Sequence, residues 1–289
     1  MTEEILENTT VEEATENTSE RVFTIKDFLE AGVHFGHRTM RWNPKMAPYI
    51  YGSRNGIHII DLTQTVLLMN DATRVLREVA KKKGKILFVC TKKQGAETVA
   101  KMAEECGQYY VTNKWLGGML TNWRTISQSI RKIKSIETQL ITDTKLVKKE
   151  KLYLQKQKEK LEKNFNGIKA IGGKPDLIFV IDVPKENLAI SEARSLGIPV
   201  MAITDTNADP DKVDYLIPGN DDSIKAIELY CEIIKSALKE FKSNPEEAKV
   251  KKQPQSQKKS KSVVRGKNND KRKKVVKSDK KKSENTESK

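Results

Sequence analysis

Short, continuous apolar runs alternate with helical patterns along most of this chain, and this alternation limits its possible folds more than any other feature. Two runs, residues 85–90 and 177–181, lack the polar and apolar alternation of a half-exposed strand, so they predict strands buried on both faces. Residues 108–111, 200–203 and 213–217 predict three more strands. Helical segments separate most of them, which is typical of an α/β fold with a mostly parallel sheet and helices on both faces.

A charged helical pattern interrupts this alternation at residues 123–167. Ile126, Ile130 and Ile133 form one apolar stripe, a second stripe includes Leu154 and Leu161, and a turn is expected at residues 142–144. The pattern predicts an antiparallel helical hairpin of coiled-coil type, inserted between the two parts of an α/β domain at 23–122 and 168–241. The hairpin is rich in lysine, and either a solvated helix face or RNA binding explains that richness. Its candidate RNA contacts are Lys148 and Lys149.

Charge is distributed unevenly along the 289 residues. Residues 1–20 carry seven Glu and no Lys or Arg, whereas residues 241–289 carry 18 Lys or Arg against six Asp or Glu. The net charge of +15 therefore leaves +10 on residues 21–240. These compositions predict a disordered acidic leader at 1–22 and a disordered basic tail at 242–289. A basic body together with a basic tail favours a partner rich in phosphate.

Cations and aromatic rings are interleaved between residues 33 and 46. This segment contains Arg38, Arg41, Trp42 and Lys45, and the Asn-Pro pair that ends at Pro44 predicts a turn. Rings stack on bases while cations hold phosphates, so the pattern predicts RNA binding by these four side chains. Pro44 is expected to shape the loop.

His34 and His37, in the same segment, raise the question of a metal site. A zinc site needs three or four ligands, and no Cys, Asp or Glu is nearby in the sequence. The sequence therefore predicts no metal ligands.

Residues 49–60 predict a β-hairpin. The Asn55-Gly56 pair between the two apolar segments is the usual signal for a tight turn. Arg54 lies just before this turn and is a further candidate RNA contact. Asp61 is expected to cap the helix that follows, and Asp221 or Asp222 to cap the last helix of the domain.

One loop, residues 113–124, fits neither a strand nor a helix. Its adjacent Gly117 and Gly118 permit positive φ or a close approach to another surface, so they are expected to shape the loop. Trp115 supplies a flat apolar face with one N–H donor, which suits either a core or a ligand. The candidate RNA contacts in this loop are Lys114, Trp115 and Arg124.

Polar residues follow the predicted strands at their carboxyl ends, where open α/β sheets bind ligands. Lys92 and Lys93 come after the first buried strand and are candidate RNA contacts. Asp205 and Asn207 follow a later strand, where Asp and Asn favour capping of a tight loop. The alternative hypothesis is an α/β enzyme that binds a phosphorylated or nucleotide substrate in this crevice.

The chain lacks the common motifs of catalytic and nucleotide-binding sites, which favours a binding protein. No G-x-G-x-x-G follows the first strand, no G-x-x-x-x-G-K-[ST] is present, and no nucleophile with a recognisable base stands out. We therefore predict no catalytic residues and no cofactor. A third hypothesis is a free regulatory protein held to RNA mainly by its basic tail.

Cysteine use and hydropathy indicate the compartment. Cys90, Cys106 and Cys231 are odd in number and widely spaced, which suggests neither a disulfide framework nor a zinc cluster. No apolar run approaches the roughly 18 residues that span a bilayer, and no signal peptide begins the chain. The expected location is the cytoplasm.

Four segments carry long and specific motifs. They are GVHFGH (32–37) with RWNPKM (41–46), YGSRNGIHIID (51–61), KWLGGMLTN (114–122), and LGIPV (196–200) with DTNADP (205–210) and IPGNDD (217–222). Together, and in this order, they resemble the family of bacterial small-subunit ribosomal protein number two. The resemblance covers residues 23–240. Where that family commonly has Asn-Gln-Arg before the tryptophan, this chain has Thr112-Asn113-Lys114, which keeps a cation.

The resemblance implies a Rossmann-like or flavodoxin-like domain with a protruding helical hairpin. It also implies a structural, non-enzymatic role in the small ribosomal subunit, binding small-subunit rRNA and neighbouring ribosomal proteins during assembly and translation. The implied protein partners include the large, OB-fold-rich ribosomal protein number one. No nucleotide cofactor, membrane association or homo-oligomer is expected.

Overall fold

The computed structural model of the chain describes residues 23–142 and 147–239. Backbone contacts divide the chain into Met1–Asn244 and Pro245–Lys289, and all described residues belong to the first unit. The predicted acidic leader at 1–22, residues 143 and 144 of the predicted turn, and the predicted basic tail at 242–289 lie outside the described residues. None of the described helices is long and apolar enough to cross a membrane.

Five parallel strands form the main sheet, in the order β5-β4-β6-β7-β8. Its strands are β4 (Ile86–Val89), β5 (Tyr109–Val111), β6 (Leu177–Ile181), β7 (Val200–Thr204) and β8 (Tyr215–Pro218). The predicted parallel α/β sheet is confirmed. The last strand begins two residues later than predicted, because the 3-10 turn η3 (Pro210–Lys212) and its exit occupy the preceding residues.

Successive residues of the central strands enter two separate cores. In β4, Ile86 and Phe88 face one core, whereas Leu87 and Val89 face the other. Because side chains alternate along a strand, a continuous apolar run is what two buried faces require. The first core is completed by α2 (Leu62–Lys81), α3 (Lys93–Glu105) and α7 (Ile224–Leu238), and the second mainly by α4 (Trp123–Thr142) and α6 (Asn187–Ser195).

Of the two helix caps predicted for α2 and α7, one is confirmed and the other is wrong. Asp61 accepts a hydrogen bond from Thr63 N at 3.0 Å and caps α2, as predicted. The cap of α7 is Ser223, so the prediction of Asp221 or Asp222 is wrong. Both aspartates instead contact Lys92. The remaining short helices are α1 (Ile25–Glu30), η1 (Pro44–Tyr49) and η2 (Asn166–Ile168).

A second, antiparallel sheet has the order β1-β3-β2. β2 (Ile50–Arg54) and β3 (Ile57–Ile60) form the predicted hairpin, and the turn residues Asn55 and Gly56 have φ of 53° and 75°. Both values are those of the tight turn that an Asn-Gly pair favours. The third strand, β1 (Phe35–Arg38), was not predicted as a strand and pairs with β3. The RNA-binding candidates in this part of the chain are thereby placed around one small sheet.

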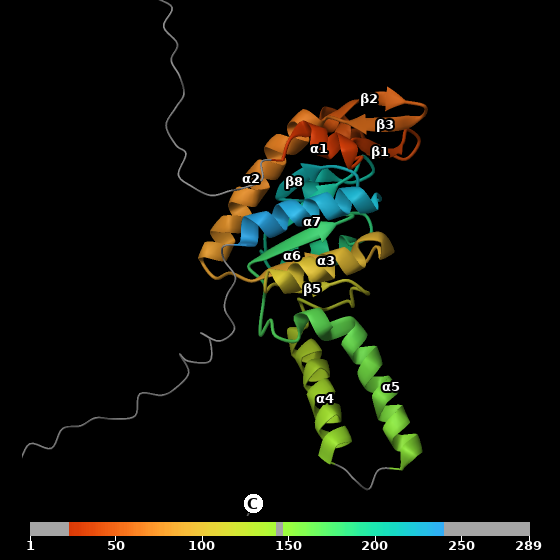
Figure 1. Cartoon of the computed structure of the whole chain (residues 1–289), viewed down its shortest axis with the longest axis vertical. Coiled ribbons are helices and arrows are strands. Elements are labelled where there is room, and N and C mark those ends of the chain that lie inside the picture. Colours follow the sequence, from red (N-terminus) through yellow and green to blue (C-terminus); the bar gives the residue numbers. More distant parts are fainter. Residues whose placement is uncertain (1–22, 143–146, 240–289) are drawn as a thin grey trace, which may run out of the picture. The chain divides into compact units, whose positions relative to one another are not determined.

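Helices α4 and α5 (Lys148–Phe165) pack side by side, beside the β5 edge of the main sheet (Figure 1). They run in opposite directions, because Glu137 of α4 pairs with Lys158 at 3.3 Å while Asn113, before α4, donates to Asn164 near the end of α5. The predicted stripe of Ile126, Ile130 and Ile133 is buried. Coiled-coil packing along the rest of the pair stays a prediction.

Candidate nucleic-acid interface

Three arginines surround β3 at the turn end of the small sheet. Arg38 of β1 and Arg54 of β2 both lie opposite Ile57, one on each side. Adjacent strands are about 4.8 Å apart, so these two backbones are separated by about 10 Å. Arg41 lies in the turn that follows β1, and its N–H donates to the Arg38 carbonyl at 2.8 Å. All three arginines are exposed, and no carboxylate within the described ranges pairs with them.

An aromatic ring lies beside these cations. Trp42 is 39% exposed, and its ring centroid is 5.1 Å from that of His58 in β3. The imidazole packs against the indole, and part of the indole remains open to solvent. An exposed ring next to unpaired guanidinium groups is the combination that binds bases and phosphates together.

Lys45, predicted with this group, already has partners within the protein. Its ammonium lies 3.1 Å from Asp209 and 2.5 Å from Asp211, which are the N-cap and a member of η3. These contacts raise the pKa of Lys45, with Asp211 as the larger cause. Pro44 occupies the first position of η1, and the preceding Asn43 side chain accepts from Lys45 N, so Pro44 shapes this turn. Lys45 therefore ties η1 to η3.

Lys92 and Lys93 are adjacent in sequence but occupy opposite environments. Lys93 begins α3 and is exposed. Lys92 is only 9% exposed, and its ammonium lies 3.0 Å from Asp182, 2.7 Å from Asp221 and 2.7 Å from Asp222. A buried ammonium with three carboxylates around it holds the protein together, so we assign Lys92 a structural role in place of the predicted RNA contact.

The pKa values of Lys92 and its neighbours are shifted by burial and by the charges that surround it. Desolvation alone would lower the pKa of Lys92, but Asp221 and the other carboxylates raise it above its ordinary value. Burial, with the charge of Asp205 nearby, raises the pKa of the Asp221 carboxyl to about 7. The pKa of His37 is also raised, because Asp205 accepts a hydrogen bond from its ring. This end of the sheet therefore holds more carboxylate than cation.

The position of Lys92 bears on the enzyme hypothesis. The strand order turns back between β4 and β6, and in open α/β sheets ligands bind beyond the strand ends at such a reversal. Lys92 follows β4 and Asp182 follows β6, so their ion pair occupies this point. Thr91, also after β4, donates its N–H to Glu186 at 3.0 Å. The protein's own side chains therefore fill the position where a nucleotide would enter.

The loop at residues 113–124 is organised around one carboxylate. Glu192 of α6 is 7% exposed, and it accepts hydrogen bonds from the indole of Trp115 and from backbone N–H groups of the loop. The backbone donors are Gly118 at 2.8 Å, Leu120 at 3.0 Å and Thr121 at 3.1 Å. Trp115 is 8% exposed and packs in the second core. Of the two roles considered for Trp115, the core role is the one that this geometry supports.

Glycine is required at one of the two adjacent positions. Gly118 has a φ of 85°, a conformation that side chains disfavour, and an added Cβ would lie 3.0 Å from the Asn122 Cβ. Gly117 has no such constraint, because its nearest neighbour would be a Leu188 methyl group at 3.7 Å. Lys114 and Arg124 lie on either side of this clamped loop, and both are exposed. The loop thus holds two cations at fixed places on the surface.

The hairpin places Lys148 and Lys149 in the first turn of α5, where both are exposed. The positive end of the helix dipole lies there, so cations at this position are unfavourable without an anionic partner. Further along the hairpin, Lys158 pairs with Glu137, and Lys169 pairs with Glu162 at 2.9 Å. The exposed lysines therefore lie at the start of α5, and the paired lysines lie further along the chain.

Some contacts were missed by sequence reasoning. Glu192 gave no signal, because an acidic residue on a helix is ordinarily solvated. The aspartates around Lys92 come from two separate segments, although Asp182 and the Asp221-Asp222 pair each follow a predicted strand. Asp205 does accept from the N–H of Thr206 in its own loop, and it also accepts from the ring of His37, 168 residues away. Asn207 likewise contacts that ring, at 3.2 Å.

Comparisons with known proteins agree on one family. A family model described as ribosomal protein S2 matches residues 28–241. A protein of Ruegeria sp. (strain TM1040), named small ribosomal subunit protein uS2, is 55% identical over 216 residues, which cover 74% of this chain and 84% of the relative. The protein of the same name from Idiomarina loihiensis is 54% identical over 228 residues, or 78% of this chain and 94% of the relative.

Proposed function

Because this chain belongs to the ribosomal protein S2 family, we propose that it is a structural constituent of the small ribosomal subunit in the cytoplasm. The single observation that carries this proposal is the identity of about 55% with small-subunit proteins over most of the described chain. The role is to bind small-subunit rRNA and neighbouring ribosomal proteins and, in our proposal, requires no catalysis. The ion pair at the strand reversal supports the last point, because Lys92 and Asp182 already pair with each other where a nucleotide would be expected to bind.

The principal RNA contact in this proposal is the turn end of the small sheet. Arg38, Arg41 and Arg54 are exposed and unpaired within the described residues, and Trp42 offers its ring beside them. Guanidinium groups match phosphate geometry with two parallel hydrogen bonds, so three of them around one strand form a backbone-binding surface. We call Arg38, Arg41 and Arg54 the arginine edge. Strand pairing with β3 holds the backbones of Arg38 and Arg54 in place.

Secondary contacts come from cations elsewhere on the described surface. Lys93 begins α3, so the N–H groups of that helix terminus and the lysine favour the same anion. The unfavourable position of Lys148 and Lys149 at the start of α5 is relieved when a phosphate binds there. The proposed secondary contacts are Lys93, Lys114, Arg124, Lys148 and Lys149.

Sedimentation tests the role in the subunit. An affinity-tagged full chain expressed in bacterial cells should sediment with small subunits at low magnesium, where the two subunits separate. Recovery of the tagged chain only in the soluble fraction would end the proposal. We also propose the OB-fold-rich ribosomal protein number one as a protein partner, on the family resemblance, and expect it in subunits purified through the tag.

Salt-dependent RNA binding tests the arginine edge. Replacing Arg38, Arg41 and Arg54 by Gln should weaken binding to small-subunit rRNA and reduce the salt slope by about 2 to 3, since each lost phosphate contact removes about 0.7 to 0.9. The control replaces three exposed lysines by Gln: Lys81 at the end of α2, its C-cap Lys82, and Lys225 of α7. Equal losses in both variants would show that overall charge, and not the arginine edge, drives binding.

A further inference from the structure

The small sheet is joined to the main sheet by an unusual set of polar contacts. His37 of β1 donates from Nδ1 to Oδ2 of Asp205, which follows β7, at 2.8 Å. The backbone N–H of His37 donates to Thr206 Oγ1 at 2.9 Å. Gly36 permits this approach, because a Cβ there would lie 2.6 Å from a Thr206 methyl group. The imidazole is thereby held in a fixed place at the end of the main sheet.

The hydrogen bond to Asp205 fixes the chemical form of the imidazole. With its proton on Nδ1, the neutral ring carries a lone pair on Nε2. Nε2 lies 3.6 Å from Oδ2 of Asp222 and 3.2 Å from the side chain of Asn207. Asn207 Nδ2 donates to Nε2 in this structure, and a metal ion would take the place of that contact. A carboxylate behind one nitrogen, with the other nitrogen turned toward a second carboxylate, is the arrangement that orients metal-binding histidines.

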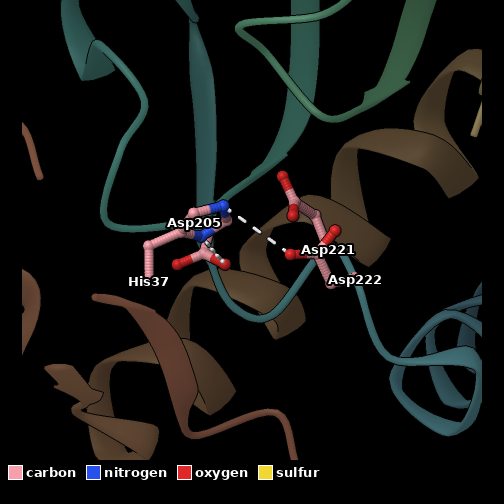
Figure 2. A group of neighbouring side chains, drawn as sticks. All are labelled: His37, Asp205, Asp221 and Asp222. Carbon is pink, nitrogen blue, oxygen red and sulfur yellow. Dashed lines mark hydrogen bonds and ion pairs between the residues drawn. The ribbon is translucent and has the colours of Figure 1, made fainter. Parts of the chain in front are cut away.

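Two aspartates complete the group from the opposite side. Asp221 and Asp222 each bind Lys92 through Oδ1 at 2.7 Å, which fixes both carboxylates and leaves their Oδ2 atoms for another partner. His37, Asp205, Asp221 and Asp222 each offer one ligand atom, and these atoms lie within 4.8 Å of one another. Figure 2 shows the four side chains turned toward a common point.

Unused acceptor atoms indicate what this group lacks. Asp221 is fully buried, and its Oδ2 has no hydrogen-bond partner within the described part of the chain. Oδ1 of Asn207 is also buried without a partner there. A buried carboxylate oxygen without a partner costs free energy, and a proton donor or a cation removes that cost. The nearest ammonium, Lys92, is already shared among three carboxylates.

We propose that this group binds one divalent first-row transition metal ion, with His37 Nε2 and the carboxylates of Asp221 and Asp222 as ligands and Asp205 orienting the imidazole. One imidazole nitrogen with carboxylate oxygens suits Zn²⁺ or Mn²⁺, whereas Mg²⁺ prefers oxygen alone. Two ligands on a tetrahedral ion with bonds near 2.1 Å are about 3.4 Å apart. The 3.6 Å between Nε2 and Asp222 Oδ2 fits that separation.

The ion has a structural task that goes beyond the proposed role in the subunit. It links β1 to the segment after β8, so it holds the small sheet on the main one. Arg38 of the arginine edge directly follows His37. Loss of the ion should therefore loosen the orientation of the arginine edge without unfolding the domain.

Metal binding by the purified full chain tests the proposal independently of the ribosome. After treatment with a chelating resin, the chain is dialysed against Zn²⁺, Mn²⁺ or Mg²⁺, and bound metal is measured by mass spectrometry. Co²⁺ is added separately, because its visible absorption reports nitrogen and oxygen ligands. The variants are H37Q and D222N, with H58Q and D71N as matched controls outside the group.

The native chain and both controls should bind one Zn²⁺ or Mn²⁺ and develop the Co²⁺ absorption. H37Q and D222N should bind at least tenfold more weakly and lose it. Asp222 is 56% exposed, so D222N should fold even if H37Q does not, and circular dichroism checks this. Equal metal uptake by all five proteins would overturn the proposal, as would equal affinity for Mg²⁺ and Zn²⁺.

Discussion

Trp115 donates its indole N–H to Glu192, 77 residues further along the chain, at 3.2 Å. The same carboxylate accepts from three backbone N–H groups of the Trp115 loop. The loop next to the candidate RNA contacts Lys114 and Arg124 is therefore held by a side chain of α6, and both the loop and α6 pack in the second core. A backbone without regular structure obtains from Glu192 the hydrogen bonds that a helix or sheet would otherwise provide.

Removal of this carboxylate should destabilise the domain. In E192A the indole N–H of Trp115 and the backbone N–H of Leu120 lose their acceptor, and each buried donor without a partner costs about 1 to 3 kcal/mol. We expect urea unfolding to show a loss of about 2 to 4 kcal/mol. Glu228 of α7 is exposed, so E228A is the matched control and should change stability by less than about 0.5 kcal/mol. Equal stability of E192A and E228A would contradict the clamp.

The same carboxylate should make stability depend on acid pH. Burial tends to raise the pKa of Glu192, but hydrogen bonds from Thr121, Gly118 and Leu120 outweigh it and lower the pKa below 4.5. A lowered folded pKa contributes stability above the unfolded value and loses it as the pH falls through the folded value. The unfolding free-energy difference between the native chain and E192Q should therefore be constant above pH 4.5 and shrink below it. A difference that grows with acidity would reverse the sign of this assignment.

Two neighbouring lysines should respond oppositely to the same substitution. K92M leaves Asp182 and Asp221 as buried carboxylates without their cation, so we expect a loss of about 3 to 5 kcal/mol in a chelator-treated sample. K93M removes an exposed charge and should change stability by less than about 0.5 kcal/mol while weakening rRNA binding. Denaturant unfolding and filter binding measure the two effects. A stable K92M that binds RNA poorly would restore Lys92 as an RNA contact.

At the junction between the hairpin and the main sheet, Gly167 occupies a position that has no space for a side chain. A Cβ at Gly167 in η2 would lie 2.1 Å from the Tyr110 carbonyl oxygen of β5, and a strand backbone cannot move away cheaply. We expect G167A to lose about 1 to 3 kcal/mol, as overpacking usually costs. Nothing lies within 4 Å of a Cβ added at Gly52 in β2, so G52A should keep its stability. Unfolding curves of the two variants give the comparison directly.

The strands that were predictable from sequence are those with both faces buried. Leu177–Ile181 is apolar at every position because each residue enters one of two cores. β1 was missed because Phe35 and Arg38 are exposed, and its strand conformation depends on pairing with β3 about 20 residues later. Local sequence cannot report such a partner.

The site residues show the same limit. The exposed Arg38, Arg41 and Arg54 were predicted from composition and spacing alone, and no carboxylate in residues 23–142 and 147–239 pairs with them. Lys92 looked equivalent to Lys93, yet its partners come from segments 90 to 130 residues away. The sequence does not distinguish a core position from a ligand contact for Trp115, because its acceptor, Glu192, lies in a helix whose residue pattern gives no sign of this contact. The sequence therefore supplied candidate cations, but it could not tell solvated cations from paired ones.

The order β5-β4-β6 has a consequence for folding during synthesis. β4 pairs with β6 across an intervening segment that holds the whole α4–α5 hairpin, so Phe88 meets Phe179 only after that hairpin has been made. At about 5 to 20 residues per second, this interval lasts about 5 to 20 s in bacteria. During that time one edge of β4 lacks its neighbour and remains open to incorrect pairing. The β4–β6 pair at the centre of the sheet therefore closes only after the hairpin has been made and before β7 and β8 extend the sheet, and the nascent chain needs protection there until residue 181 has left the ribosome that makes it.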